Sequence, residues 1–317
     1  MNPVAYLLLR SMKRPDNPGM RLLTRHGSLD LSGPPVVMGI LNVTPDSFSD
    51  GGKYVAVEAA SRRASRMIEE GAAVIDVGPE SSRPGAAAVV PQEQMRRAVP
   101  AIEAIRRHHT DVVISIDTTS AEVASAALRA GADLINDISA LRGDPQMTAL
   151  AAETGAPLIL MHMLGTPSTM QQNPHYTDVV AEVRQFLAER VEFAVAAGVA
   201  RSRIVIDPGI GFGKTAAHNC ELMRRLDELA TLGPPVLLGA SRKSVVRGFV
   251  GSETTALVAG SLMCALAGAM AGAKILRVHD VRETVHLVRG APVFFVTQAD
   301  CRHGRGAGGA TGVCGRP

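Results

Sequence analysis

The sequence predicts a closed (β/α)8 barrel, the TIM-barrel architecture, folded as a single domain. Eight short apolar runs alternate with eight helical patterns between residues 36 and 289. The runs are too uniformly apolar for strands with one wet face, which is typical of parallel strands covered on both sides. Every run also ends in a group that can donate or accept a hydrogen bond. A barrel uses all such ends at one mouth, whereas a doubly wound open sheet, the alternative fold, uses those at a single switch point.

The expected strands and helices alternate along the chain. In order, the strands are 36–41, 74–77, 112–116, 134–135, 158–161, 204–206, 236–238 and 275–278. The helices are 55–70, 92–108, 121–130, 145–153, 178–197, 218–230, 254–271 and 281–289. The polar groups at the strand ends are Asn42, Asp76, Asp117, Asn136 with Asp137, His162, Asp207, Ser241 to Lys243, and Arg277 with His279. In a TIM barrel these carboxyl ends carry the active site.

Two further segments flank the barrel, which we expect to span 21–290. Residues 1–20 lack periodicity and are expected to be a flexible extension. Turn signals at Gly27 and Gly33 suggest that residues 21–31 form a hairpin that plugs one end of the barrel. The stretch Gly290-Ala291-Pro292 is expected to end the last helix, because proline lacks an N–H. Residues 291–317 are then expected to be an irregular or disordered tail.

The composition is that of a globular protein with an aliphatic core, at 46% hydrophobic residues, 20% charged residues and no Trp. A net charge of +3 with scattered basic residues does not favour nucleic acid as a partner. The N-terminal apolar run is too short for a secretory signal, and no segment offers the roughly 20 apolar residues of a membrane span. The four cysteines form no CxxC pair, which argues against a zinc site or disulfide framework and for a cytoplasmic protein.

A glycine-rich turn, IVIDPGIGFGK at 204–214, follows the sixth expected strand and places Asp207 at its end. It is not a P-loop, because Pro208 stands where the first glycine of that motif belongs. It is not the dinucleotide-binding fingerprint either, because Lys214 takes the place of the third glycine. A plain strand-to-helix turn remains the other interpretation.

The expected mouth combines carboxylates, carboxamides and cations. They are Asp76, Asp117 and Asp207, Asn42 and Asn136, and Lys243, Arg277 and His279. A carboxylate accepts two parallel hydrogen bonds from an amidine-like edge, so this set suits a flat heterocycle rich in N–H groups. The cations follow the last two strands, where barrels commonly bind phosphate. Two long loops, 43–53 and 78–90, follow adjacent strands and would be either lids over this mouth or plain connections.

Each of these residues also has a purely structural interpretation. Asp76 and Asp117 could be helix N-caps, and Asn136-Asp137 could be an ordinary turn. Lys243 could lie in a solvated loop. His162 is better interpreted as a packed or loop histidine than as a catalyst.

Eight motifs occur in order along residues 21–289. They are GILNVTPDSFSDGG (39–52), IDVGPESSRPGA (75–86), SIDT (115–118), INDI (135–138), LMHMLGTPSTMQ (160–171), DPGIGFGKT (207–215), GASRKS (239–244) and RVHDV (277–281). Together they closely resemble the bacterial dihydropteroate synthase family. The resemblance implies a (β/α)8 barrel, usually a homodimer, that works in folate biosynthesis. It also implies a transferase that condenses 6-hydroxymethyl-7,8-dihydropterin diphosphate with p-aminobenzoate, through an SN1-like step, to give 7,8-dihydropteroate and pyrophosphate. Sulfonamides compete with the benzoate in this family.

The resemblance further implies roles for individual residues. The pterin would be bound by Asp117, Asn136, Asp207 and Lys243, with Met161, Gly239 and Asp76 beside them. The diphosphate would meet Asn42, Arg277 and His279, and Asn42 would also contact Mg²⁺. The benzoate would be bound by Ser82, Arg83, Pro84, Phe212, Lys243 and Ser244. The first mobile loop would include Thr44, Pro45, Asp46 and Ser49. The catalytic candidates are Asp117, Asp207, Lys243 and Arg83.

One loop departs from the family pattern, which usually has two glycines followed by Glu-Ser-Thr-Arg. This chain has Gly78-Pro79-Glu80-Ser81-Ser82-Arg83, so Pro79 removes an N–H and Ser82 lacks a methyl group beside the benzoate site. Sulfonamide sensitivity is therefore left open. Two other functions also stay open: a pterin-binding paralogue without synthase activity, and a methyltetrahydrofolate-dependent methyl transfer to a corrinoid protein, which has no use for the benzoate residues.

Overall fold

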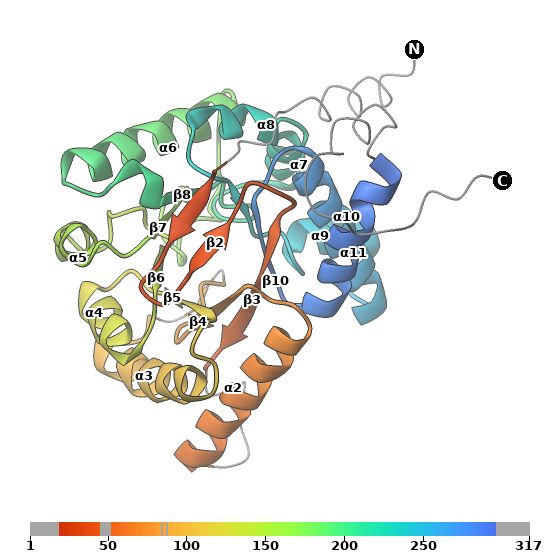
Figure 1. Cartoon of the computed structure of the whole chain (residues 1–317). Helices are drawn as coiled ribbons and strands as arrows, with labels where there is room; N and C mark the ends of the chain where they lie inside the picture. The colour runs from red at the N-terminus through yellow and green to blue at the C-terminus, as the bar shows by residue number, and fades with distance from the viewer. Residues whose placement is uncertain (1–18, 45–51, 84, 87, 296–317) are drawn as a thin grey trace.

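A computed structural model describes residues 19–44, 52–83, 85–86 and 88–295 and shows an eight-stranded parallel sheet inside a ring of helices (Figure 1). The strands are β3 (Val36–Asn42), β4 (Val74–Gly78), β5 (Val113–Asp117), β6 (Leu134–Asp137), β7 (Leu158–Met161), β8 (Ile204–Asp207), β9 (Leu237–Leu238) and β10 (Ile275–Val278). They are hydrogen-bonded in the order β8-β7-β6-β5-β4-β3-β10-β9. A parallel bridge from Ile206 to Val236 joins the two outer strands. The sheet therefore closes into the predicted (β/α)8 barrel.

The helices cover the sheet because each buries one apolar stripe against it. The long ones are α2 (Gly52–Glu69), α3 (Pro91–His108), α4 (Ala121–Ala130), α5 (Gln146–Thr154), α6 (Val179–Ala196), α7 (Ala216–Arg224), α10 (Thr254–Met270) and α11 (Val281–Phe295). The expected helix 218–230 is broken at Arg225, whose backbone leaves the helical region at φ −114° and ψ 24°. A separate short helix, α8 (Leu226–Leu229), follows that break, and α9 (Ser244–Val250), which the sequence did not predict, precedes α10.

The last helix is longer than expected. We expected Gly290-Ala291-Pro292 to end it, and that expectation is wrong, because α11 continues to Phe295. Proline removes only one N–H donor. The helix is held by its packing, since Val281, Val285 and Val288 on one face are buried in the main core. Residues 291–295 are thus helical, and residues 296–317 lie outside the described part of the chain.

The predicted hairpin closes the amino-terminal end of the barrel. Strands β1 (Arg21–Leu23) and β2 (Ser28–Asp30) pair antiparallel. Their buried residues Leu22 and Leu29 form one apolar cluster with the first residues of the barrel strands, such as Val74. The inside of the barrel is therefore filled at this end, and a ligand must enter it from the other end.

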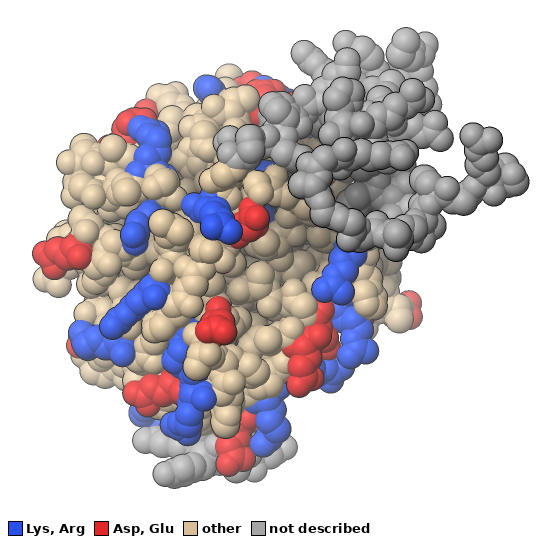
Figure 2. All heavy atoms as spheres, viewed as in Figure 1, with Lys and Arg blue, Asp and Glu red and all other residues tan. Residues whose placement is uncertain are grey.

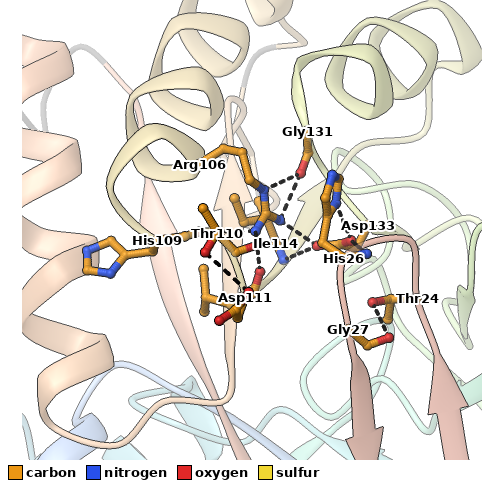
Figure 3. A network of polar contacts seen from close by, with 11 residues as sticks. Thr24, His26, Gly27, Arg106, His109, Thr110, Asp111, Ile114, Gly131 and Asp133 are labelled. Atoms are coloured by element: carbon orange, nitrogen blue, oxygen red, sulfur yellow. Dashed lines mark hydrogen bonds and ion pairs between the residues drawn. The ribbon is translucent and has the colours of Figure 1, made fainter.

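A polar network fastens the hairpin to the barrel (Figure 3). At its centre is the fully buried carboxylate of Asp133. One of its oxygens lies 3.0 Å from the His26 backbone N and 2.8 Å from His26 Nδ1. The other accepts hydrogen bonds from the Ile114 N–H at 2.9 Å and from Arg106 Nη2 at 2.7 Å. Every lone pair of this buried charge is directed at a donor, which is what burial of a carboxylate requires.

On the face of the molecule shown in Figure 2, Lys and Arg side chains alternate with Asp and Glu, without a large patch of either sign. Within the described residues, no single helix is long and apolar enough to cross a membrane. The pair α9 and α10, bent by 112°, passes that test by length and composition alone.

Candidate active site

Side chains from four strands, β4, β5, β6 and β10, meet at the carboxyl end of the barrel. Arg277 of β10 donates from Nε to Asp76 Oδ2 at 2.6 Å and from Nη2 to Asp117 Oδ2 at 2.7 Å. Asn136 of β6 donates from Nδ2 to the same Asp76 oxygen at 3.3 Å. The structure thus brings together one guanidinium, two carboxylates and one carboxamide.

The strand register explains why these side chains share one space. Side chains alternate between the two faces of a strand, and residues paired in register point the same way. Asp117 pairs with Asn136, and Asp76 pairs with Ser115. Asp76 Oδ1 and Ser115 Oγ are buried and, among the described residues, have no hydrogen-bond partner. Buried polar atoms normally have partners, so this pair is suited to receive hydrogen bonds from a ligand.

A second group lies beside the first and comes from the glycine-rich turn. Asp207 ends β8, and its Oδ1 accepts from the Gly209 N–H at 2.7 Å. Lys243 donates from Nζ to Ile210 O at 2.6 Å and stands 4.5 Å from the centre of the Phe212 ring. A methyl group placed on Gly239 would lie 3.8 Å from Asp207 Oδ2, so this glycine forms part of the wall next to the carboxylate.

Burial dominates the electrostatics of this site. Burial raises the pKa of Asp117 to about 7, which Arg277 opposes and Asp76 reinforces. Burial also raises the pKa of Asp207, against the effect of Lys243. Burial lowers the pKa of Lys243 to about 8, while Asp207 acts in the opposite direction. These mutual effects show that the acids and bases occupy one common space, where a cationic or N–H-rich ligand would favour the ionised carboxylates.

Two of the residues expected to meet phosphate, His279 and Asn42, lie at the ends of the neighbouring strands β10 and β3. His279 follows β10, and its Nδ1 lies 3.1 Å from Ser241 Oγ. Burial, reinforced by Arg277 and Arg242, lowers the pKa of His279 to about 4, so its ring is neutral at pH 7. Asn42 ends β3, and a methyl group placed on Gly78 would stand 3.3 Å from Asn42 Oδ1. A larger side chain at position 78 would therefore crowd the amide oxygen.

The second loop is anchored despite its proline. The carboxylate of Glu80 accepts from the Val89 N–H at 2.7 Å and from Gln94 Nε2 at 3.0 Å. Pro79 O accepts from Arg97 Nη1 at 3.0 Å. The Gly85 N–H donates to Pro167 O at 3.3 Å, which ties this loop to the loop after β7. These contacts fix the loop next to the mouth.

The remaining predicted residues fall into three groups. Met161 and Phe212 are buried in one small apolar cluster, beside the groups just described. Thr44 and Ser82 are half-buried, whereas Arg83 and Ser244 are exposed. The positive charge of Arg83 nevertheless acts on His279, because it helps to lower the pKa of that ring. Four predicted residues, Pro45, Asp46, Ser49 and Pro84, lie outside the described residues.

The purely structural interpretations hold for some of these residues and fail for others. Neither Asp76 nor Asp117 is an N-cap, because Val90 precedes α3 and Ser120 caps α4. Asp137, in contrast, is a turn residue, since its carboxylate accepts from the N–H groups of Ser139 and Leu141. His162 is a packed histidine, as the sequence favoured. It is buried, and its ring lies 4.8 Å from that of Phe186.

The sequence analysis did not name Ser115, and it missed the burial of Lys214. Lys214 closes the glycine-rich turn and is only 3% exposed, with its Nζ 2.8 Å from His162 Nδ1. Lysine is almost never fully buried, so a sequence reading assigns it to the surface by default. Its position directly after three alternating glycines was the only available signal.

A cavity of about 480 Å³ lies at the opposite end of the barrel. It is lined by the hairpin turn and by the ends of α4 and α5, including Arg25, Arg129, Asp133 and Arg203. Asp133 already has both oxygens engaged in the network of Figure 3. Because the amino-terminal end of such barrels serves stability and the carboxyl end carries chemistry, we place the active site at the mouth.

Comparison with known proteins points to one family. The family model for pterin binding enzymes matches residues 38–279. Dihydropteroate synthase of Escherichia coli K12 is 47% identical over 270 residues, which are 85% of this chain and 95% of that protein. Dihydropteroate synthase of Synechocystis is 46% identical over 259 residues, 80% of this chain and 88% of that protein.

Solved structures give the same result. The Xanthomonas albilineans dihydropteroate synthase with 4-aminobenzoic acid superposes with a TM-score of 0.81 at 46% identity, covering 87% of this chain and 98% of that one. The Yersinia pestis dihydropteroate synthase in a sulfonamide drug complex has a TM-score of 0.81 at 46% identity, covering 86% and 98%. The chain belongs to the dihydropteroate synthase family of pterin binding enzymes.

Proposed function

We propose that this protein condenses 6-hydroxymethyl-7,8-dihydropterin diphosphate with p-aminobenzoate to give 7,8-dihydropteroate and pyrophosphate. The observation that carries the proposal is the meeting of Asp76, Asp117 and Arg277 from three strands, with Asp207 and Lys243 beside them. This set can bind one flat ring rich in N–H groups at the centre of the mouth.

The carboxylates have two tasks in this reaction. First, Asp207 and the unpartnered Asp76 Oδ1, together with the amide of Asn136, are suited to hydrogen-bond the amidine-like edge of the pterin. The second task concerns the reacting bond. When the bond between the methylene carbon and the diphosphate oxygen breaks, positive charge spreads over the ring. Buried carboxylates stabilise such a charge far better than water does. The site thus favours an SN1-like departure of the diphosphate.

The benzoate is expected to bind where Phe212, Lys243 and Ser244 meet Ser82 and Arg83 of the second loop. The ring of Phe212 offers an apolar wall, and the cations suit the carboxylate of the benzoate. Its amine nitrogen carries a free electron pair and attacks the methylene carbon directly. After the attack the nitrogen is positively charged and loses one proton readily, so no strong base is required.

Mg²⁺ fits the diphosphate end of the site. Within the described residues, no three His, Cys, Asp or Glu side chains form a metal site, but Mg²⁺ commonly takes one or two protein oxygens plus substrate phosphates. Asn42 Oδ1, which a larger side chain at position 78 would crowd, would supply the protein oxygen. When bound, the ion would neutralise charge on the leaving diphosphate. Arg277 and the neutral His279 would contact the same phosphate groups.

The two loops are proposed to cover the mouth during the reaction, because a reactive cation must be shielded from water. Glu80 holds the second loop in place although Pro79 replaces a glycine of the family pattern, which speaks against an inactive paralogue. The set of benzoate-binding residues speaks against methyl transfer to a corrinoid protein. Sulfonamide binding would use the same pocket as the benzoate.

We also propose a homodimer in the cytoplasm. Two of the large apolar side chains most exposed in the described structure, Phe249 of α9 at 58% and Met263 of α10 at 68%, lie on adjoining helices. Burial of this face against a second copy would remove it from water. The described cysteines Cys220 and Cys264 are free thiols, as in a reducing compartment.

A pyrophosphate-release assay with both substrates tests the activity. The synthase releases pyrophosphate only when p-aminobenzoate and the pterin diphosphate are both present, and 7,8-dihydropteroate forms in equal amount. A paralogue would bind the pterin without turnover, and a methyltransferase would consume methyltetrahydrofolate instead. Either result would refute the proposal.

A further inference from the structure

Lys214 is a buried lysine that the reaction described above does not use. Burial lowers its pKa well below the usual value, while Asp207 acts in the opposite direction. Lys214 Nζ donates to Gly209 O and Phe212 O, both at 3.0 Å, and lies 2.8 Å from His162 Nδ1. These three partners fill the hydrogen-bonding capacity of the amine, which has two N–H donors and one electron pair when neutral and three N–H donors when charged. Burial, reinforced by Lys214, lowers the pKa of His162 to about 2, so its ring is neutral and pairs with the amine.

The turn that Lys214 holds has a conformation that only glycine adopts easily. Gly209, Gly211 and Gly213 have φ values of 66°, 84° and 64°. A methyl group on Gly209 would overlap the carbonyl oxygen of His162. The turn is therefore pressed against the end of β7. Within the turn the Phe212 N–H donates to Gly209 O at 3.0 Å, and the other carbonyl groups take their partners from outside it.

Two lysines bind carbonyl groups of the turn from opposite sides. Lys214 binds Gly209 O and Phe212 O from the buried side, whereas Lys243 binds Ile210 O, between them, from the pocket side at 2.6 Å. Lys243 also faces the ring of Phe212 at 4.5 Å. Any shift of the turn would therefore move both a wall and a cation of the benzoate pocket.

We propose that Lys214 is a positioning residue that holds the turn 209–213 so that Phe212 and Lys243 are aligned for the aryl amine substrate. This inference rests on the proposed function. The acids Asp76 and Asp117 are fixed independently by Arg277. Asp207, which the pterin also meets, accepts from the Gly209 N–H of the turn, so the pterin would lose part of its site as well. The aryl amine depends on both Phe212 and Lys243, whereas the pterin keeps Asp76, Asp117 and Asn136, so loss of Lys214 affects the aryl amine more.

The test is the variant Lys214→Met, which keeps the length of the side chain and removes its donors. The KM for p-aminobenzoate is expected to rise about tenfold or more, while the dissociation constant of the pterin substrate, from titration calorimetry, changes less than about threefold. Lys214→Arg, which keeps several N–H donors, should recover part of the loss. If the methionine variant does not fold, Lys214→Gln, which keeps an amide donor, replaces it.

One control separates positioning from general damage. Lys274→Met removes a lysine that donates to Gly33 O at 3.0 Å at the other end of the barrel. It should leave the KM for p-aminobenzoate and the dissociation constant of the pterin in their wild-type ratio. The inference is overturned if Lys214→Met raises the KM for p-aminobenzoate and the dissociation constant of the pterin by the same factor, or if Lys274→Met raises only the first of them. An inactive wild-type protein would refute the proposed function instead.

Discussion

Replacing Asp117 with asparagine tests the electrostatic role of the site. The carboxylate accepts from Arg277 Nη2 at 2.7 Å, and its side chain is 11% exposed. Asparagine keeps the size and one acceptor oxygen but removes the negative charge. Arg277 remains paired with Asp76 at 2.6 Å, so the fold of the mouth should persist.

The expected loss of rate follows from what the charge does. A hydrogen bond to a charged group contributes about 1.5–3 kcal/mol to stability, of which the amide oxygen retains a part. A preorganised group that stabilises charge in the transition state lowers the barrier by about 2.7–4 kcal/mol. Asp117→Asn should therefore lower kcat about 100-fold to 1,000-fold, with only a small change in Tm.

The assay is pyrophosphate release at saturating substrates, with thermal melting on the same samples. Asp133→Asn is the matched control, because Asp133 is also a buried carboxylate paired with an arginine, Arg106, at 2.7 Å, but at the opposite end of the barrel. It should lower Tm and leave the kcat of the folded protein unchanged. Wild-type turnover in Asp117→Asn would refute the assignment, as would an equal loss of kcat in Asp133→Asn.

Three further predictions concern pH, the turn and the metal. The value of kcat/KM should rise as Asp117 loses its proton near pH 7 and fall as Lys243 loses its proton near pH 8, and Asp117→Asn should abolish the acid limb of the pH profile. Because the folded pKa of Asp117 lies above its unfolded value, its contribution to stability is present below about pH 4 and is lost as pH rises through 7, which melting curves without substrate would show. Gly209→Ala should lower Tm by several degrees and abolish turnover, because the new methyl group overlaps His162 O, and unchanged melting would contradict this. Asn42→Ala should raise the Mg²⁺ concentration for half-maximal activity about tenfold, and an unchanged requirement would remove Asn42 from the metal site.

The strand ends were predictable because two independent signals coincide there. Apolar runs such as 204–206 must be buried, and a polar residue directly after them, here Asp207, cannot be buried without a purpose. Alternation of strands and helices then fixes the barrel, and the barrel places all such ends at one mouth. Most polar residues at the mouth could thus be named from the sequence, although the same rule also selected Asp137 and His162, which serve a turn and the packing, and passed over Ser115.

The pairings within the mouth could not be predicted in this way. Arg277 lies far along the chain from Asp76 and Asp117, and no spacing rule indicates which strand end a guanidinium will reach. Lys214 was missed because its burial depends on carbonyl groups of a turn whose conformation the sequence only suggests. The extension of α11 beyond Gly290 was missed because local glycine and proline signals were weighed without the packing that overrides them.

The most direct test of the whole account is a crystal structure of the protein with a bound pterin. We expect the ring at the mouth, with its N–H edge within hydrogen-bond distance of Asp207 and Asn136, and Asp117 and Lys243 beside it. A pterin bound elsewhere, or one at the mouth without contact to these side chains, would contradict the claim that residues from distant strands form a single pterin site.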